Sequence, residues 1–119
     1  MTNKTTGKYG EELACQFLTK NGFKVLEKNF RYSKMAEIDI VALKNDIIHF
    51  VEVKTRTQTF FGNPLEAITK AKLESIYKCA LYYIQNNKKY TNFQIDAIGI
   101  VLNKNNETEI NFIENININ

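Results

Sequence analysis

The sequence has no apolar run that approaches the ~20 residues of a membrane-spanning helix, and residues 1–12 lack the apolar core of a signal peptide. We therefore expect a cytoplasmic protein that has no membrane partner. Cysteine and histidine are also scarce: Cys15 and Cys79 stand far apart, and His49 is the only histidine. This scarcity argues against a zinc site and against a Ser-His-Asp nucleophile. In the cytosol, both cysteines would be reduced and packed as small hydrophobic groups.

A large excess of charge of one sign is absent, because the net charge is +3 over 119 residues. The distribution is uneven. Residues 1–34 carry seven Lys or Arg against three Glu, and residues 35–119 carry nine against ten acidic residues. A positive N-terminal third beside a cluster of acids suits an anionic polymer that approaches a metal ion. Charge alone favours a simpler explanation, a Lys- and Asn-rich surface that keeps the protein soluble.

Two strands joined by a tight turn form the stretch around which we expect the chain to fold. Residues 36–43 begin with apolar and acidic side chains in alternation, and residues 47–56 are rich in Ile, Phe and Val. Lys44-Asn45-Asp46 is the only turn-forming cluster between them. If Asn45-Asp46 is a two-residue loop, Lys44 pairs with Ile47, whereas a three-residue turn would shift this register by one.

The two-residue turn would bring two carboxylates together, because its register places Asp39 opposite Glu52 and Glu37 opposite Lys54. Opposed residues lie on the same face, with Cβ atoms about 5 Å apart. Glu52 and Lys54 are two residues apart on one strand, so they share that face as well. Two carboxylates in this arrangement repel each other unless a cation lies between them. The hairpin therefore predicts a site where acidic side chains and a lysine converge.

The remaining elements follow from periodicity and from turn residues. They are a helix over residues 7–21, a strand over 23–30, a helix from residue 63 to about 87, a strand over 93–102 and an edge strand over 108–113. In the second helix, Asn63 would be the N-cap, Pro64 the first helical residue and Glu66 the capping-box partner. A strand–helix–strand unit predicts a right-handed crossover between parallel strands.

The expected fold is α/β, with the element order α-β-β-β-α-β-β and a mixed five-stranded sheet flanked by helices. The first three strands would be antiparallel, and the fourth would lie parallel to the third. We expect a single domain over residues 1–119, with frayed ends at 1–6 and 114–119.

Isolated charged residues are further candidates. Lys72 falls in the apolar stripe of the second helix, where it either extends its charge outward or points to the two acids and a phosphate. Glu11 lies at the edge of the first helix's apolar stripe, and an exposed position is the simpler explanation. Asp96, near the start of a buried strand, would pair with Lys or Arg rather than bind a metal.

Two loops carry groups that suit a nucleic acid. Arg31 and Lys34 lie in the connection before the hairpin, where they would contact phosphates or remain solvated. Phe60-Phe61, in the loop over residues 57–62, would stack on unpaired bases, although folding back on the core is more common for such a pair.

Asp39 and Glu52, with the backbone carbonyl of Val53, offer hard oxygen ligands that suit Mg²⁺ or Mn²⁺. A cation there would polarise a phosphoryl oxygen and lower the pKa of a bound water. Lys54 would position or deprotonate that water, or neutralise the transition state. An acid followed by Glu-x-Lys is a weak signal alone, and its weight comes from the apolar neighbours of both acids.

From about residue 7 to residue 101, the chain resembles the YraN family, small bacterial proteins with a restriction-endonuclease-like fold. The matching runs are Gly10-Glu11-Glu12-Leu13-Ala14, Lys28-Asn29-Phe30-Arg31, Glu37-Ile38-Asp39, Phe50-Val51-Glu52-Val53-Lys54 with Arg56, Phe61-Gly62-Asn63-Pro64-Leu65-Glu66-Ala67, and Lys72. The fold's nuclease motif, PD-(D/E)xK, would fall on Asp39, Glu52 and Lys54. Archaeal Holliday-junction resolvases are also similar, and their helical glutamate would fall on Glu11.

The resemblance implies a Mg²⁺- or Mn²⁺-dependent nuclease that hydrolyses phosphodiester bonds in DNA, including branched or structured DNA. The implied catalytic residues are Asp39, Glu52, Lys54 and Glu11, and the nucleic acid would be contacted by Arg31, Lys34, Arg56 and Lys72. Three positions depart from the family: Ala36 stands where Gly is usual, and Gln94 and Ser75 stand where Arg is usual. The metal ligands are retained, but fewer basic groups are left to bind DNA.

Two alternatives remain open. One is a non-catalytic nucleic-acid-binding module that retains this fold, and the other is a protein-interaction domain whose acids form a network of ion pairs. A nuclease that makes two symmetric cuts would need a homodimer, but the sequence identifies no self-complementary patch.

Overall fold

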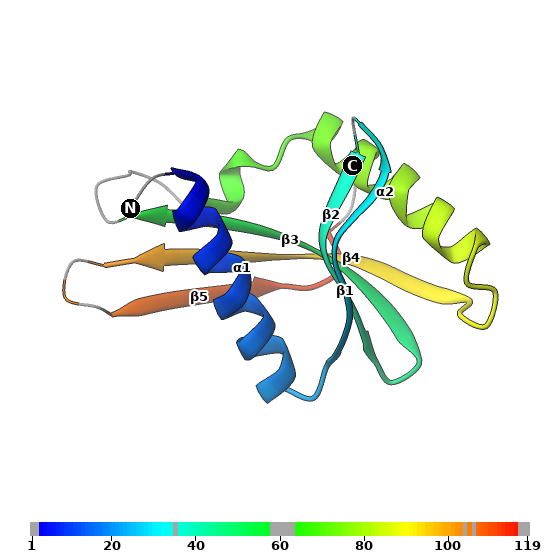
Figure 1. Ribbon diagram of the computed structural model, residues 1–119, viewed down its shortest axis with the longest axis horizontal. Helices are drawn as coiled ribbons and strands as arrows, with labels where there is room; N and C mark the ends of the chain where they lie inside the picture. Colours follow the sequence, from blue (N-terminus) through cyan, green and yellow to red (C-terminus); the bar gives the residue numbers. More distant parts are fainter. Residues whose placement is uncertain (1–2, 35, 58–63, 104, 106, 117–119) are drawn as a thin grey trace.

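The computed structural model describes residues 3–34, 36–57, 64–103, 105 and 107–116 (Figure 1). The elements are α1 (Asn3–Lys20), β1 (Lys24–Ser33), β2 (Ala36–Lys44), β3 (Ile47–Thr57), the short 3₁₀ helix η1 (Pro64–Ala67), α2 (Lys70–Gln85), β4 (Asn92–Leu102) and β5 (Thr108–Ile113). The expected order of helices and strands is confirmed, with η1 added. Among these residues, no helix has the length and apolar character needed to cross a membrane.

The five strands form one mixed sheet in the order β1-β2-β3-β4-β5, as predicted. β3 and β4 run parallel, and the other neighbouring strands run antiparallel. Asn45 and Asp46 have φ values of 52° and 63°, the positive values that a two-residue hairpin turn requires. The hairpin pairs run from Lys44↔Ile47 to Ile40↔Val51, so the predicted register is confirmed over this stretch.

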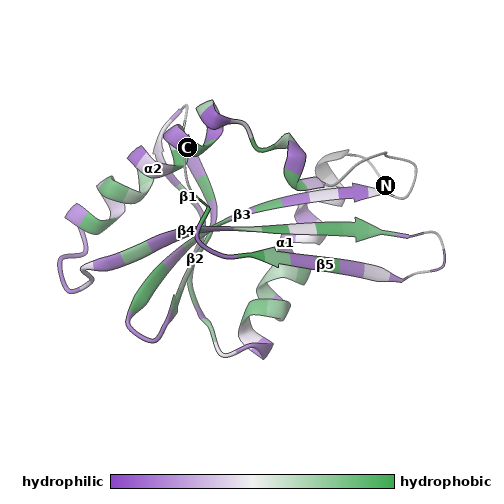
Figure 2. Cartoon of the chain, turned by 180° about the vertical axis from the view of Figure 1, so that it is seen from behind, coloured by the Kyte–Doolittle hydropathy of each residue, from purple (hydrophilic) through white to green (hydrophobic). Residues whose placement is uncertain are grey.

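One helix covers each face of the sheet. The buried residues of α2 on its face are Leu73, Ile76, Cys79, Ala80 and Tyr83, and those of α1 on the other face are Ala14 and Leu18. β3 contributes to both cores, because Phe50 faces α2 whereas Val51 and Val53 face α1. This alternation puts Glu52 and Lys54 on the α2 face. Figure 2 shows the hydrophobic stretches within the strands and the hydrophilic turns that join them.

The N-terminal half of β2 separates from β3. Their pairing ends at Ile40↔Val51, although β2 remains paired with β1 as far as Ala36. Ile38 accordingly packs in the core under α2, whereas Ile40 packs on the α1 side. Figure 1 shows the β1–β2 pair turned away from the direction of β3 and β4. Asp39 therefore lies where the two strands part.

The second helix begins later than the sequence predicts. η1 occupies Pro64–Ala67, and α2 starts directly after its N-cap, Thr69. Thr69 has an extended backbone, which interrupts the helix, and its Oγ1 accepts a hydrogen bond from the backbone N–H of Lys72 at 3.1 Å. Glu66 therefore lies in η1 and not in the first turn of α2, and its predicted capping partner, Asn63, lies outside the described residues.

α1 begins at Asn3, four residues before the predicted start, and approaches β3 closely at Gly10. A Cβ atom on Gly10 would lie 1.8 Å from Thr55 Oγ1 and 2.9 Å from Thr55 Cβ. A residue without a side chain is therefore required at this contact. The close approach fixes the height above the sheet of Glu11, the next residue of the helix.

Candidate functional site

Asp39 bridges the gap that opens between β2 and β3. Its Oδ2 accepts a hydrogen bond from the backbone N–H of Val53 at 2.8 Å. Where the strands part, this bond keeps the β3 backbone paired. It also brings Asp39 close enough to Glu52 for the two carboxyl groups to share a hydrogen bond when Glu52 is protonated.

Glu52 is buried on the α2 face, with only 4% of its side chain exposed. Burial, together with the hydrogen bond and the negative charge of Asp39, raises the pKa of Glu52 to about 9. Among the described residues, Glu52 Oε2 has no hydrogen-bond partner, although Lys72 Nζ forms an ion pair with it at 3.7 Å. A buried carboxylate oxygen without a donor is energetically unfavourable, and a bound cation would compensate for the missing donor.

Glu11 of α1 and Glu37 of β2 complete a group of four acids. With its amide nitrogen turned towards the carboxylates, Asn29 donates hydrogen bonds to Glu11 Oε1 and to Glu37 Oε1, both at 3.1 Å. Partial burial and the charges of Asp39 and Glu37 raise the pKa of Glu11. We call Glu11, Glu37, Asp39 and Glu52 the acidic cluster. Glu11 thus lies beside the acids of the hairpin and is half-buried there.

Two lysines approach the acidic cluster from the α2 side. Lys72 stands in the first turn of α2 and points to Glu52, as the second of its two sequence interpretations proposed. Lys54 shares the face of Glu52 on β3, and the positive charges of both lysines lower the pKa of Glu52. The hairpin and the helix together therefore place two ammonium groups around one buried carboxyl group.

The other residues predicted to contact nucleic acid, Arg31, Arg56 and Lys34, do not share the surroundings of Lys72 and Lys54. Arg31 Nη2 donates to Glu37 Oε2 at 3.2 Å across the β1–β2 ladder. The predicted opposition of Glu37 and Lys54 is therefore wrong, because β2 has already left β3 at that point. Arg56 Nη1 donates to the Thr55 carbonyl oxygen at 3.0 Å, and Lys34 is exposed after β1. The predicted stacking pair, residues 60–61, lies outside the described residues.

Asp96 pairs with His49, and the predicted pairing with Lys or Arg is wrong. His49 Nδ1 and Asp96 Oδ2 are 2.6 Å apart, and both side chains are buried. Asp96 Oδ1 accepts hydrogen bonds from Gln94 Nε2 and from the backbone N–H of Asn115, each at 2.9 Å. With Glu114, these two residues form a group whose ligand atoms lie within 4.8 Å of one another, so it could hold a metal ion.

This second group lies on the face opposite Glu52. His49 packs edge-to-face on Phe23 of the α1-side core, with ring centroids 4.8 Å apart. The sequence did not predict this group, because each of its polar residues is ordinary when taken alone. A usable signal was present: once β3 and β4 are parallel neighbours, His49 pairs with Gln94, and Asp96 lies two residues further along β4 on the same face.

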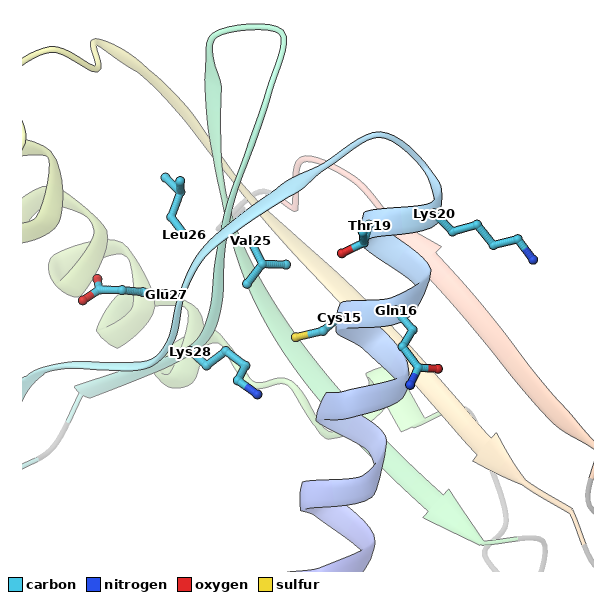
Figure 3. A pocket seen from close by; sticks show the side chains of 8 residues that line it. All are labelled: Cys15, Gln16, Thr19, Lys20, Val25, Leu26, Glu27 and Lys28. Atoms are coloured by element: carbon cyan, nitrogen blue, oxygen red, sulfur yellow. The ribbon is translucent and has the colours of Figure 1, made fainter.

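An open groove lies elsewhere, between α1 and β1 (Figure 3). It has a volume of about 720 Å³, and its lining residues are Cys15, Gln16, Thr19, Lys20, Val25, Leu26, Glu27 and Lys28. None of the four acids lines it. The acidic cluster therefore lies apart from this groove, where β2 leaves β3.

Comparison with known proteins now places the chain in a family. A family model described as "Uncharacterised protein family UPF0102" matches residues 10–100. The chain belongs to the UPF0102 family. A UPF0102 protein of Clostridium novyi is 46% identical over 115 residues, covering 95% of each chain. UPF0102 proteins of Syntrophomonas wolfei and Dictyoglomus thermophilum are 40% and 42% identical, covering 95% and 87% of this chain and 97% and 88% of theirs.

Proposed function

We propose that this UPF0102 protein is a Mg²⁺- or Mn²⁺-dependent nuclease that hydrolyses phosphodiester bonds in DNA, including branched or structured DNA. The observation that carries the proposal is the buried Glu52 Oε2, which has no hydrogen-bond donor in the part of the chain that the structure describes and lies in the acidic cluster beside Asp39. The resemblance to restriction-endonuclease-like proteins supports it, since their motif falls on the same acids.

The donor set fits a hard divalent cation. The ligands would be the carboxylates of Asp39 and Glu52 and the carbonyl oxygen of Val53, all of them oxygen atoms. When bound, the cation would polarise a phosphoryl oxygen and acidify a coordinated water. Glu52 would give up its proton to the solvent when the cation binds, because metal ligands must be deprotonated.

The positively charged side chains of the protein would position the water and bind the phosphate groups. Lys54 would hold the attacking water or neutralise charge on the phosphoryl group, and Lys72 would neutralise Glu52 or contact a neighbouring phosphate. Glu11 would orient groups at the cluster through its contacts with Asn29 and Asp39. Lys34 and Arg56 would contact the DNA backbone, as would Arg31 if it is released from Glu37.

Mn²⁺ titration by calorimetry tests the metal site. Two groups of residues could bind the ion, so the variants must separate them. Glu52→Gln should weaken binding at the acidic cluster, whereas His49→Gln, the matched control, should leave that binding event unchanged. Unchanged Mn²⁺ affinity in Glu52→Gln, together with lost binding in His49→Gln, would move the metal to the other face and refute the ligand role of Glu52.

Cleavage assays test the activity. Wild type should nick branched, single-stranded or duplex DNA only when Mg²⁺ or Mn²⁺ is present, and Asp39→Asn should abolish nicking. Cleavage that survives in Asp39→Asn would come from a contaminant. Binding without cleavage in any metal would instead favour the non-catalytic module, and no binding at low salt would favour a protein-interaction domain.

A further inference from the structure

Exposed aromatic side chains gather where α2 meets the end of β1. Tyr32 of β1 is 50% exposed and Tyr82 of α2 is 39% exposed, and their ring centroids lie 4.5 Å apart with the planes tilted by 38°. Tyr77 and Leu81 of the same helix are also exposed. Four of the six exposed large hydrophobic residues in the described part of the chain therefore lie on these two elements.

Phe30 supports the two rings from the side of the core. Phe30, which packs against the α2-side core, stacks on Tyr82 with centroids 6.3 Å apart and planes 27° from parallel. Phe30 and Tyr32 both contact the Tyr82 ring, so they lie on the same side of β1. The Tyr32–Tyr82 pair is thus anchored on the core through Phe30, yet both rings present a large part of their surface to solvent.

Two lysines stand near the pair in α2 and after β1. Lys78 stands one helical turn before Tyr82 on the same side of α2, and Lys34 follows Tyr32 by two residues. Over its whole length α2 carries three lysines against one glutamate. An aromatic surface flanked by ammonium groups complements a polyanion that also has flat apolar rings, which is the chemistry of an unpaired nucleic-acid strand.

The pair lies on the α2 side of the sheet, which is also the side of Glu52. Phe30 and Tyr32 both contact the Tyr82 ring, whereas Arg31 and its ladder partner Glu37 lie on the other face of β1–β2. Lys72, in the first turn of α2, forms an ion pair with Glu52. A strand that covered the two tyrosines would therefore follow α2 towards Lys72 and Glu52.

We propose that Tyr32 and Tyr82 form a stacking platform for unpaired bases, so that the site takes DNA with a single-stranded segment rather than fully paired duplex. This inference rests on the proposed function for its choice of polymer. Bases in a duplex are already stacked on one another, so only splayed or single-stranded bases can cover the rings.

The test is fluorescence anisotropy with a labelled single-stranded oligonucleotide and with its blunt duplex, in EDTA so that no metal-dependent cleavage occurs. Tyr32→Ala and Tyr82→Ala should each weaken single-strand binding by about tenfold, with less than about twofold change for the duplex. Tyr82→Phe keeps the ring and should keep the affinity. Tyr82→Leu keeps the apolar contact with Phe30 but has no aromatic face, so it should bind as weakly as Tyr82→Ala.

Tyr9→Ala is the matched control, because Tyr9 is 42% exposed but lies on α1, away from the pair. Equal losses in Tyr9→Ala, equal losses for duplex and single strand, or full single-strand affinity in Tyr82→Leu would each overturn the platform. Self-association of wild type that disappears in Tyr82→Ala, without any single-strand binding, would also overturn it and assign the patch to a protein contact.

The platform and the nuclease can fail separately. If single-strand binding depends on the tyrosines but no metal supports cleavage, the platform stands and the proposed activity falls. If metal-dependent cleavage is intact in both alanine variants on single-stranded and duplex substrates alike, the activity stands and the platform is refuted.

Discussion

Replacing Glu52 by glutamine should stabilise the metal-free protein at neutral pH. The pKa of Glu52 is raised from 4.5 to about 9 by burial and by Asp39, so folding favours the protonated carboxyl group. A group with a raised pKa contributes its full stability below its unfolded pKa and loses it as the pH rises through its folded pKa. The loss therefore begins near pH 4.5 and continues to about pH 9.

The size of the effect follows from the same shift. One pKa unit corresponds to about 1.4 kcal/mol, so ionisation in the unfolded state costs wild type up to about 3 kcal/mol of folding free energy between pH 4.5 and pH 7. Glutamine has nearly the shape of the protonated acid and does not titrate. The difference in unfolding free energy between Glu52→Gln and wild type should be small near pH 4.5 and grow to about 3 kcal/mol at pH 7.

Urea unfolding of wild type and Glu52→Gln in EDTA, from pH 4.5 to pH 8, measures this difference. Glu12→Gln, on the exposed side of α1, is the matched control and should show no such growth. The effect of Mn²⁺ is measured at pH 7 in two proteins that both carry His49→Gln, so that only the acidic cluster can bind the ion. Saturating Mn²⁺ should raise the unfolding free energy of the protein with Glu52 and leave that of the protein with Glu52→Gln nearly unchanged. A constant difference across the pH range, or a destabilised variant at pH 7, would refute the buried, proton-binding Glu52.

Three other changes probe the same framework. Gly10→Ala should cost about 1–3 kcal/mol in urea unfolding because its Cβ would overlap Thr55. Gly7→Ala, whose added Cβ meets no atom of the described residues within 4 Å, should stabilise by about 0.5–1 kcal/mol. Lys54→Ala should lower the cleavage rate more than the Mn²⁺ affinity, and equal losses in both would argue against a role in the reaction step. Lys72→Met should move the pH midpoint of Mn²⁺ binding upward, since its charge lowers the pKa of Glu52; an unmoved midpoint would contradict the ion pair.

The β2–β3 hairpin could be predicted because its determinants are local. Asn45-Asp46 tolerates the positive φ values of a tight turn, and strand alternation then fixes which residues share a face. The departure of β2 from β3 could not be predicted, because it depends on the twist of the whole sheet and on the packing of Ile38 under α2. That departure replaced the expected Glu37–Lys54 opposition with a gap bridged by Asp39.

Asn29 shows a second limit on what the sequence alone can predict. Its φ of 56° is a conformation that asparagine adopts more readily than most residues, and the sequence carries that tolerance. What the sequence cannot show is that the amide reaches Glu11 from α1 and Glu37 from β2, which are far apart along the chain. Local patterns identified the acids, and the tertiary fold decided how they are joined.

The late start of α2, which the sequence did not predict, and the position of Lys72 have one cause. A helix running from residue 63 would put Lys72 deep inside the helix, where its charge would need an exit from the apolar stripe. Because Thr69 interrupts the helix, Lys72 instead belongs to the first turn, with its N–H bound by Thr69 Oγ1 and its ammonium group 3.7 Å from Glu52. The interruption at Thr69 therefore caps α2 and also brings the Lys72 ammonium group to the buried Glu52. Thr69→Ala should destabilise the protein by about 1 kcal/mol through the lost cap. It should also raise the pH midpoint of Mn²⁺ binding, because Lys72 would no longer be held beside Glu52. A loss of stability without that second shift would separate the cap from the site.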